Sequence, residues 1–215
     1  AAPGNIATPR LQFTPVPPST DDTVHVPEGW LYVHAGSEDN AVAPASPDYD
    51  TERAVIKRFA RKMLGQVPSS IGVYWHNQKV LMTMGGLGGK LKKWDACDEE
   101  LKTFAHMAVA SYIGCTWCLD FNYFEAYNKN LDMEKAREVP RWRESEVFTP
   151  LEREVMAYAE AMSQTPVTVT DGMVASLREE LGDAAVVELT AVIAFANFTT
   201  RPNVALGIES DGFAA

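Results

Sequence analysis

Apolar residues recur every three or four positions through most of the chain after residue 50, and this spacing predicts helices rather than strands. Thr51 can cap a first helix that runs to about Gln66. Ser69 or Ser70 can start a second helix, and the glycine cluster that begins at Gly85 is predicted to end it and to continue as a loop. The cluster does not match a phosphate-binding loop, because the required first glycine and the hydroxyl residue after the lysine are missing.

The next predicted helix opens at Asp95 or Asp98, has acidic residues in its first turn, and ends at Gly114. Its main apolar face is formed by Leu101, Phe104, Ala105, Ala108 and Tyr112. The opposite face is hardly more polar and carries Thr103, His106, Met107 and Ala110. We therefore expect this helix to be buried nearly all round.

Three further helices are predicted in the second half of the chain, over 149–162, 170–182 and 183–200. The first begins with Thr149 and Glu152, which have the spacing of a capping box. The last is strongly apolar and is predicted to stop before Arg201 and Pro202, because a proline ring does not fit a helix interior.

The first fifty residues are rich in proline, which excludes a long helix there. We predict an extended N-terminal arm over 1–50, with one short piece of β-structure at 29–34, and an all-helical domain over 51–215. The apolar side chains of the arm would be costly to leave in water. We therefore expect the arm to lie along the body of the protein or along a neighbouring subunit, and a disordered leader is the alternative.

The chain carries 19 basic and 29 acidic residues, and its formal charge is −10. Phosphate binding depends on clustered positive charge, so we expect neither nucleic acid nor a membrane surface as a partner. The longest apolar stretch, Leu189–Phe198, is too short to cross a bilayer, and the first residues show no secretory pattern. Three cysteines leave at least one thiol unpaired, which favours a reducing compartment and predicts a cytoplasmic location.

Cys115 and Cys118 form a Cys-x-x-Cys motif at the start of a predicted helix. Backbone amides at a helix N-terminus stabilise a thiolate, which is the species that attacks peroxides and disulfides. The spacing lets the two sulfurs meet, so one cysteine can resolve the oxidised form of the other. Two alternatives stay open, a zinc site completed by Cys97 and His106 and a pair of buried cysteines without function. Redox chemistry is the leading interpretation, with neither metal nor cofactor.

Residues 100–118 resemble the signature of the carboxymuconolactone decarboxylase and alkylhydroperoxidase D family, in which a helix leads through a glycine into Cys-x-x-Cys. Residues 148–161 and the ending 197–207, with Arg201 and Asn203, are similar to longer peroxidase-like members. The resemblance implies an all-α, orthogonal helical bundle of the alkylhydroperoxidase D-like type. It also implies a homo-oligomer, which would be a dimer, trimer or hexamer.

The resemblance further implies that Cys118 is the thiol that attacks peroxide and that Cys115 is the resolving thiol. The family also has a proton relay, with a glutamate before the first cysteine and a histidine after the second. Thr103 and Asn122 occupy these two positions here. Both ionisable members of the relay are therefore missing.

A different base would have to accept the thiol proton. His106 lies three residues after Thr103 on the same side of its helix, and Asn122 and Glu125 share the face of the cysteines. Our hypothesis is that His106, together with Glu125, provides this base, and a histidine that only packs is the alternative. Asp120 points away from the sulfurs and is expected to have a structural role.

We predict a thiol-dependent peroxidase or thiol-disulfide oxidoreductase whose catalytic residues are Cys118, Cys115, His106 and Asn122. Its substrate would be a small peroxide or disulfide, and a small or protein dithiol would donate the electrons. One alternative is a lyase or decarboxylase that acts on a small carboxylic acid in the same pocket. The other is a non-catalytic redox-sensing or ligand-binding protein.

Overall fold

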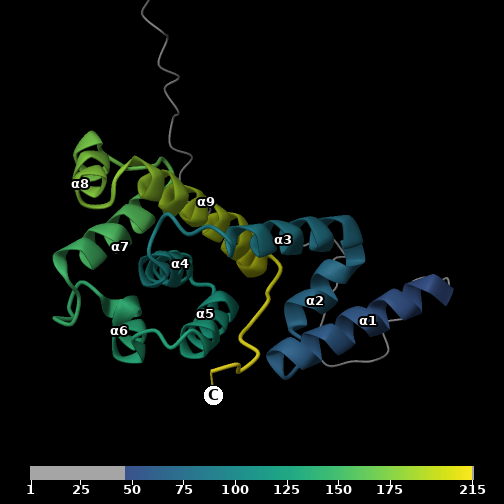
Figure 1. Ribbon diagram of the computed structural model, residues 1–215. Helices are drawn as coiled ribbons and strands as arrows, with labels where there is room; N and C mark the ends of the chain where they lie inside the picture. Colours follow the sequence, from purple (N-terminus) through teal and green to yellow (C-terminus); the bar gives the residue numbers. More distant parts are fainter. Residues whose placement is uncertain (1–46, 215) are drawn as a thin grey trace, which may run out of the picture. The chain divides into compact units, whose positions relative to one another are not determined.

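A computed structural model of the chain describes residues 47–214, with side chains from residue 54 onward. This part of the chain consists of helices and their connections and contains no strand (Figure 1). The elements are α1 (Pro47–Leu64), α2 (Ser69–Tyr74), the 3-10 helix η1 (Trp75–Asn77), α3 (Gln78–Leu91), α4 (Glu99–Ile113), α5 (Thr116–Asn128), α6 (Met133–Glu138), the 3-10 helix η2 (Val139–Arg141), α7 (Pro150–Ser163), α8 (Asp171–Leu181) and α9 (Asp183–Ala205). The all-α prediction is confirmed.

The predicted N-terminal arm and its short extended piece at 29–34 lie outside the described residues, apart from the start of α1. That helix begins at Pro47 and not at Thr51. The division of the chain at residue 50 stays a prediction. The pattern also predicted neither α6 nor η2, because both are too short to show a helical period.

Helix α4 is the centre of the hydrophobic core and packs against α5, α7 and α9. All residues from Leu101 to Ala110 are buried except His106, which confirms that the helix is covered nearly all round. Tyr112, which was predicted to lie on its main apolar face, is instead 48% exposed. Figure 1 shows α4 nearly end-on while α9 runs across the view, so the two helices cross at a steep angle, as in an orthogonal bundle.

Side chains at the predicted positions cap three of these helices. The carboxylate of Asp98 accepts hydrogen bonds from the first amides of α4, at 2.8 and 3.2 Å. Thr149 and Glu152 form the predicted capping box at the start of α7, and the hydroxyl of Thr170 caps α8. Gly114 ends α4 with a φ of 84°, in the left-handed region that glycine favours. These local predictions are confirmed.

The glycine cluster lies inside α3, so the prediction that it forms a helix exit and a loop is wrong. The interruption comes earlier, where η1 follows α2 and the side chain of Asn77 caps α3. Gly88 faces α9, and a Cβ atom added there would lie 3.4 Å from the ring of Phe195. Packing of α3 against α9 therefore outweighs the low helix propensity of the glycines.

Gly86→Ala is expected to raise the free energy of unfolding by about 0.5–1 kcal/mol, because alanine favours a helix interior more than glycine does. A Cβ atom added at Gly86 meets no other atom within 4 Å, so the gain carries no steric cost. Gly114→Ala serves as the control and is expected to lower the same quantity by about 1–2 kcal/mol, because its φ is left-handed. Denaturant titration of both variants measures the two effects, and a loss of stability in Gly86→Ala would contradict the packing described for α3.

Helix α9 continues through Pro202 to Ala205, so the prediction that it stops before Arg201 is wrong. Tertiary contacts hold its last turns. Thr200 is fully buried and Asn203 is 3% exposed, and the guanidinium of Arg201 donates a hydrogen bond to the carbonyl oxygen of Ser163 at the end of α7. The burial of Thr200 and Asn203 and the hydrogen bond of Arg201 compensate for the hydrogen bond that the proline ring removes.

Among the described helices, α9 is the one whose length and composition would allow it to cross a membrane. Leu189 and Ile193 of this helix are fully buried and belong to the main core cluster, to which α4 also contributes. The core helix of a soluble protein meets the same length and composition test. We therefore interpret α9 as a core helix.

A buried ion pair fixes the loop before α4. The Nζ atom of Lys102 lies 2.9 Å from Glu188 Oε1 and donates to the carbonyl oxygen of Trp94 at 2.7 Å. Glu188 also accepts the amides of Ala96 and Cys97. Burial acts to raise the pKa of Glu188, but the hydrogen bonds from Lys102 and the two amides outweigh it and hold this pKa below its ordinary value.

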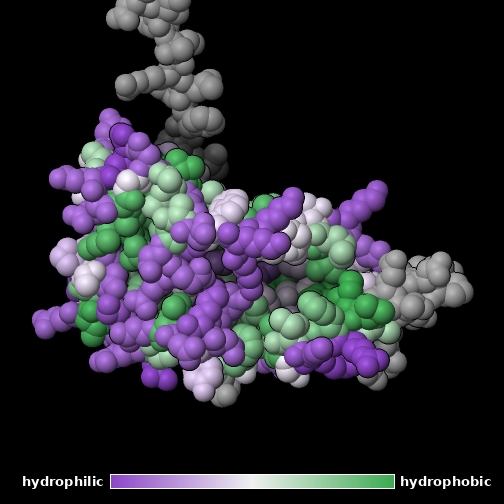
Figure 2. All heavy atoms as spheres, viewed as in Figure 1, coloured by the Kyte–Doolittle hydropathy of each residue, from purple (hydrophilic) through white to green (hydrophobic). Residues whose placement is uncertain are grey.

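Apolar side chains gather on the surface over α1 and α2 (Figure 2). Val55, Phe59 and Met63 of α1 are each exposed by more than half, at 62%, 64% and 59%. Beside them lies a groove of about 560 Å³, lined by Val55, Ile56, Trp75, Gln78, Lys79, Leu81 and Met82. These exposed apolar side chains do not by themselves test the predicted homo-oligomer, which stays a prediction.

Candidate active site

Cys115 and Cys118 lie at the start of α5 and are joined by a disulfide bond. Gly114 turns the chain out of α4, and Cys115 becomes the N-cap residue of α5. Its sulfur accepts a hydrogen bond from the backbone amide of Cys118 at 3.2 Å. The prediction that the spacing of three residues brings the sulfurs together at a helix N-terminus is confirmed.

Both cysteines are buried, with exposed fractions of 1% for Cys115 and 3% for Cys118. They form a small cluster with Ala110, against which Trp117 and Leu119 pack. This cluster is separate from the main core around α4. A substrate therefore reaches the sulfurs only when a neighbouring side chain or segment moves.

Residues from three helices meet at Cys118. The side-chain amide of Asn203, on α9, donates a hydrogen bond to Cys118 Sγ at 3.4 Å. The hydroxyl of Tyr74, on α2, donates to Asn203 Oδ1 at 2.8 Å. Burial raises the pKa of Tyr74, so its hydroxyl stays protonated and remains a donor at neutral pH. The sequence assigned no role to either residue, and Asn203 stood out only as part of the ending 197–207 that is similar to longer peroxidase-like members.

Thr103 and Asn122, which stand at the relay positions of the resemblance, both bind backbone atoms. The Asn122 amide donates to the carbonyl oxygen of Cys118 at 2.6 Å, and Asn122 is buried. The Thr103 hydroxyl donates to the carbonyl oxygen of Glu99 at 2.9 Å. Asn122 therefore lies beside Cys118 as predicted from the shared face, but it contacts the main chain and not the sulfur. Its catalytic role stays a prediction.

His106 is half-buried, and its charged neighbours are Glu125 in the second half of α5 and Lys129 just after the end of that helix. Burial lowers the pKa of His106 to about 4, so the imidazole is neutral at pH 7 and only weakly basic. Glu125 is paired with Lys92 and Lys129. Glu125 follows Cys118 by seven residues, which is about 10 Å along a helix. The predicted role of His106 as the base stays a prediction, and no hydrogen bond within the described residues joins it to a sulfur.

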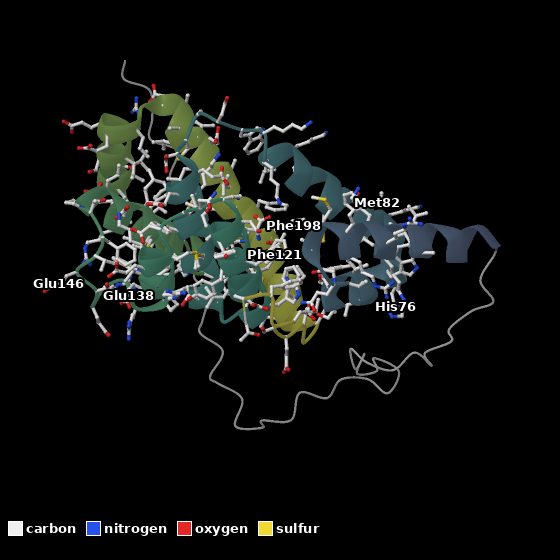
Figure 3. All side chains as sticks on the ribbon, turned by 60° about the horizontal axis from the view of Figure 1, so that its bottom comes forward. His76, Met82, Phe121, Glu138, Glu146 and Phe198 are labelled. Atoms are coloured by element: carbon white, nitrogen blue, oxygen red, sulfur yellow. A yellow bond between two sulfur atoms is a disulfide. The ribbon has the colours of Figure 1, made fainter. Side chains whose placement is uncertain are left out.

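The side chain between the two cysteines contacts the C-terminal segment, which we define as residues 208–214. Trp117 donates a hydrogen bond from Nε1 to Asp211 Oδ2 at 2.6 Å. Its ring stacks on Phe121, with 5.1 Å between ring centroids, and lies perpendicular to the ring of Phe213, with 6.2 Å between centroids. Figure 3 shows Phe121 beside the yellow C-terminal part of the chain. Trp117 therefore links the cysteine motif to this segment.

Asp120 binds the C-terminal segment directly, which agrees with its predicted structural role. Its carboxylate accepts hydrogen bonds from the amides of Gly212, Phe213 and Ala214 and from the hydroxyl of Ser210, at 2.8–3.0 Å. Burial acts to raise the pKa of Asp120, but these donors outweigh it and hold this pKa below its ordinary value. The carboxylate thus fastens the segment across α5.

The third cysteine, Cys97, lies in the main core with a free thiol. Burial is the largest of the effects that raise the pKa of this thiol to about 11, so it is protonated at neutral pH. Between residues 47 and 214, no group of three or more histidine, cysteine or acidic side chains could hold a metal ion.

Residues 79–161 match the carboxymuconolactone decarboxylase family. This part of the chain is similar to that family, and the match covers less than half of the chain. The matched range includes the whole of α4 and α5 and the cysteine motif between them. The uncharacterized protein YnjA from Escherichia coli is 31% identical over 121 residues, which are 56% of this chain and 66% of that protein. The match thus spans somewhat less than two thirds of this relative.

Solved structures with the same fold have lower sequence identity. The debrominase Bmp8 is 22% identical, with a TM-score of 0.67 over 83% of this chain and 95% of that chain. An uncharacterized peroxidase-related protein from Silicibacter sp. is 18% identical, with a TM-score of 0.68 over 82% of this chain and 94% of that chain. These likenesses confirm the predicted alkylhydroperoxidase D-like bundle.

Proposed function

We propose that this protein is a thiol-dependent oxidoreductase that reduces small peroxides through Cys118 and Cys115. The observation that carries the proposal is the bond between the two sulfurs at the N-terminus of α5, with a separate hydrogen-bond donor on each sulfur. Such donors stabilise a thiolate, and a thiolate that can be resolved by a second cysteine supports repeated turnover. The burial of both cysteines favours a small substrate.

The proposed cycle has three steps. The Cys118 thiolate attacks the peroxide, the O–O bond breaks, and Cys118 sulfenic acid forms while the alcohol leaves after taking up one proton. The thiol of Cys115 then attacks the sulfenic sulfur, so that the disulfide forms and water leaves. An external dithiol finally reduces the disulfide to two thiols and becomes a disulfide itself. The dithiol donor, the homo-oligomer and the cytoplasmic location stay predictions.

Peroxide added to the reduced protein is expected to consume two thiols per chain, and a dithiol is expected to restore both. Cys118→Ser should not consume peroxide, because the attacking sulfur is absent. Cys97→Ser is the matched control and should behave like the unchanged protein, because its thiol is buried in the core and protonated. Thiol titration and a peroxide assay measure both quantities. Undiminished peroxide turnover in Cys118→Ser would overturn the proposal.

The same assays separate the two alternative functions. A lyase that acts on a small carboxylic acid would keep its turnover after both cysteines are replaced by serine. A redox sensor would lose two thiols to peroxide and regain them when a dithiol is added, but so slowly that peroxide consumption in excess dithiol would not exceed the uncatalysed reaction of peroxide with the dithiol.

A second candidate is the reductive removal of bromine from an aromatic ring. It is favoured by the structural neighbour Bmp8, a debrominase solved in complex with 2,3,4-tribromopyrrole, and by the aromatic cluster of Trp117, Phe121 and Phe213 beside the cysteine pair. In this reaction a C–Br bond is replaced by a C–H bond and bromide leaves. The two cysteine thiols supply two electrons and become the disulfide. Bromide release from tribromopyrrole by the reduced protein tests this candidate directly.

A further inference from the structure

We infer that Asn203, oriented by Tyr74, is the residue that stabilises the thiolate of Cys118. This inference deepens the proposed function and rests on it in one respect, since it takes Cys118 to be the reacting cysteine. It assigns to α9 and α2 a part in a reaction whose cysteines both lie on α5. Asn203 is a catalytic residue in this proposal, because its amide touches the reacting sulfur, and Tyr74 is a positioning residue.

The two sulfurs have different hydrogen-bond donors. The backbone amide of Cys118, in the first turn of α5, donates a hydrogen bond to Cys115 Sγ at 3.2 Å. The helix N-terminus therefore serves Cys115 and not Cys118. Within the described residues, the donor to Cys118 Sγ is the amide of Asn203, at 3.4 Å. Without Asn203 the attacking sulfur would carry its negative charge with no hydrogen bond in a buried site.

Tyr74 determines which end of the amide faces the sulfur. An asparagine side chain has an oxygen that only accepts and a nitrogen that only donates. The Tyr74 hydroxyl donates to the oxygen at 2.8 Å, so the NH₂ group is directed at Cys118 Sγ. Asn203 is 3% exposed, which keeps water from competing for either contact. The arrangement suits a thiolate, which only accepts hydrogen bonds.

The missing relay would have two functions, which are to accept the thiol proton and to stabilise the charge of the thiolate. The side-chain amide of Asn203 supplies the second of them. Thr103 and Asn122 bind backbone oxygens and leave the sulfur without an ionisable neighbour at either relay position. An amide cannot accept the thiol proton, so a different acceptor has to take it, but the amide lowers the free energy of the charge that remains. Of the groups bonded directly to Cys118 or Asn203, Cys115 and Tyr74 can titrate, and the nearby Asp211 is bound to Ser69 and Trp117.

The test is the pH profile of alkylation of Cys118 by iodoacetamide in the full chain with Cys115→Ser. Serine is a good N-cap residue, so this background keeps the start of α5 intact and isolates one reactive thiol. In Asn203→Leu the midpoint of the profile is expected to rise by about one pH unit, which slows alkylation at neutral pH about tenfold. Asn203→Asp should shift it further, because a carboxylate repels a thiolate, and Tyr74→Phe should shift it less, because the amide is still present.

The matched control is Asn197→Leu, on the same helix, whose amide donates to Ser163 and Ile193 and not to a cysteine. It should leave the midpoint unchanged. Circular dichroism melting establishes that each variant is folded, and Tyr74→Phe and Asn203→Asp keep the size of the side chain if Asn203→Leu does not fold. An unchanged midpoint in Asn203→Asp and Tyr74→Phe would overturn the inference even if peroxide turnover is intact. Shifted midpoints without any peroxide turnover would support the role of Asn203 and overturn the proposed peroxidase.

Discussion

Replacing Glu188 with alanine is expected to lower the free energy of unfolding by about 1.5–3 kcal/mol, because it removes the buried counter-ion of Lys102 and leaves the half-exposed Glu99, at 3.2 Å, as the remaining acidic partner. The side chains of the pair are 7% and 9% exposed, so water cannot replace the lost partner. The same change also removes the acceptor for the amides of Ala96 and Cys97, before α4. Denaturant titration measures the loss.

Asp183→Ala provides a matched control on the same helix. Asp183 is paired with Arg178 at the surface, with side chains that are 76% and 57% exposed, and its loss should cost less than about 1 kcal/mol. The carboxylate of Glu188 has a lowered pKa, so its contribution is present above the ordinary carboxyl pKa and is lost as the pH falls through the lowered one. A loss in Glu188→Ala no larger than that in Asp183→Ala would contradict the buried pair.

Asp120→Ala is expected to release the C-terminal segment from α5 and to speed the reaction of the disulfide with a dithiol by about 10- to 100-fold. The reason is that the carboxylate accepts four hydrogen bonds from this segment, and each hydrogen bond to a charged group contributes about 1.5–3 kcal/mol. The segment also carries Asp211 and Phe213, which contact Trp117 next to the buried sulfurs. The rate of disulfide reduction by dithiothreitol measures the effect, and the fluorescence of Trp117 should change with it.

Asp132→Ala is the control for this prediction, because Asp132 also accepts two backbone amides but at the start of α6. It should leave the rate of reduction unchanged. The lowered pKa of Asp120 means that the segment stays fastened above the ordinary carboxyl pKa and is released only as the pH falls through the lowered value. Equal reduction rates in Asp120→Ala and the unchanged protein would show that the segment does not limit access to the sulfurs.

Local sequence was sufficient for the features that depend on neighbours a few residues apart. The caps of α4, α7 and α8 were predicted because each is a bond between a side chain and an amide within three positions. The end of α4 at Gly114 and the meeting of Cys115 with Cys118 follow from the same short range. The all-α class follows from the helical period of the apolar residues, which the packing of α4 reproduces.

The failures share a physical cause, which is that tertiary packing outweighed a local preference. The glycines of α3 stay helical against α9, and α9 passes through Pro202 because residues on either side of the proline are buried. Relative to alanine, a helix interior is less favourable by about 1 kcal/mol for a glycine and by about 3 kcal/mol for a proline. The free energy gained by burying several side chains can exceed these costs.

The sequence by itself determined that this chain is helical and that it carries two cysteines able to bond at a helix N-terminus. Only the tertiary structure decided which groups surround them. Tyr74 and Asn203 are 129 residues apart and meet at Cys118, whereas His106 lies beside Glu125 and Lys129. Such contacts depend on how α2, α5 and α9 pack together. No spacing along the chain encodes them, because helix packing angles are set by side chains distributed over all three helices.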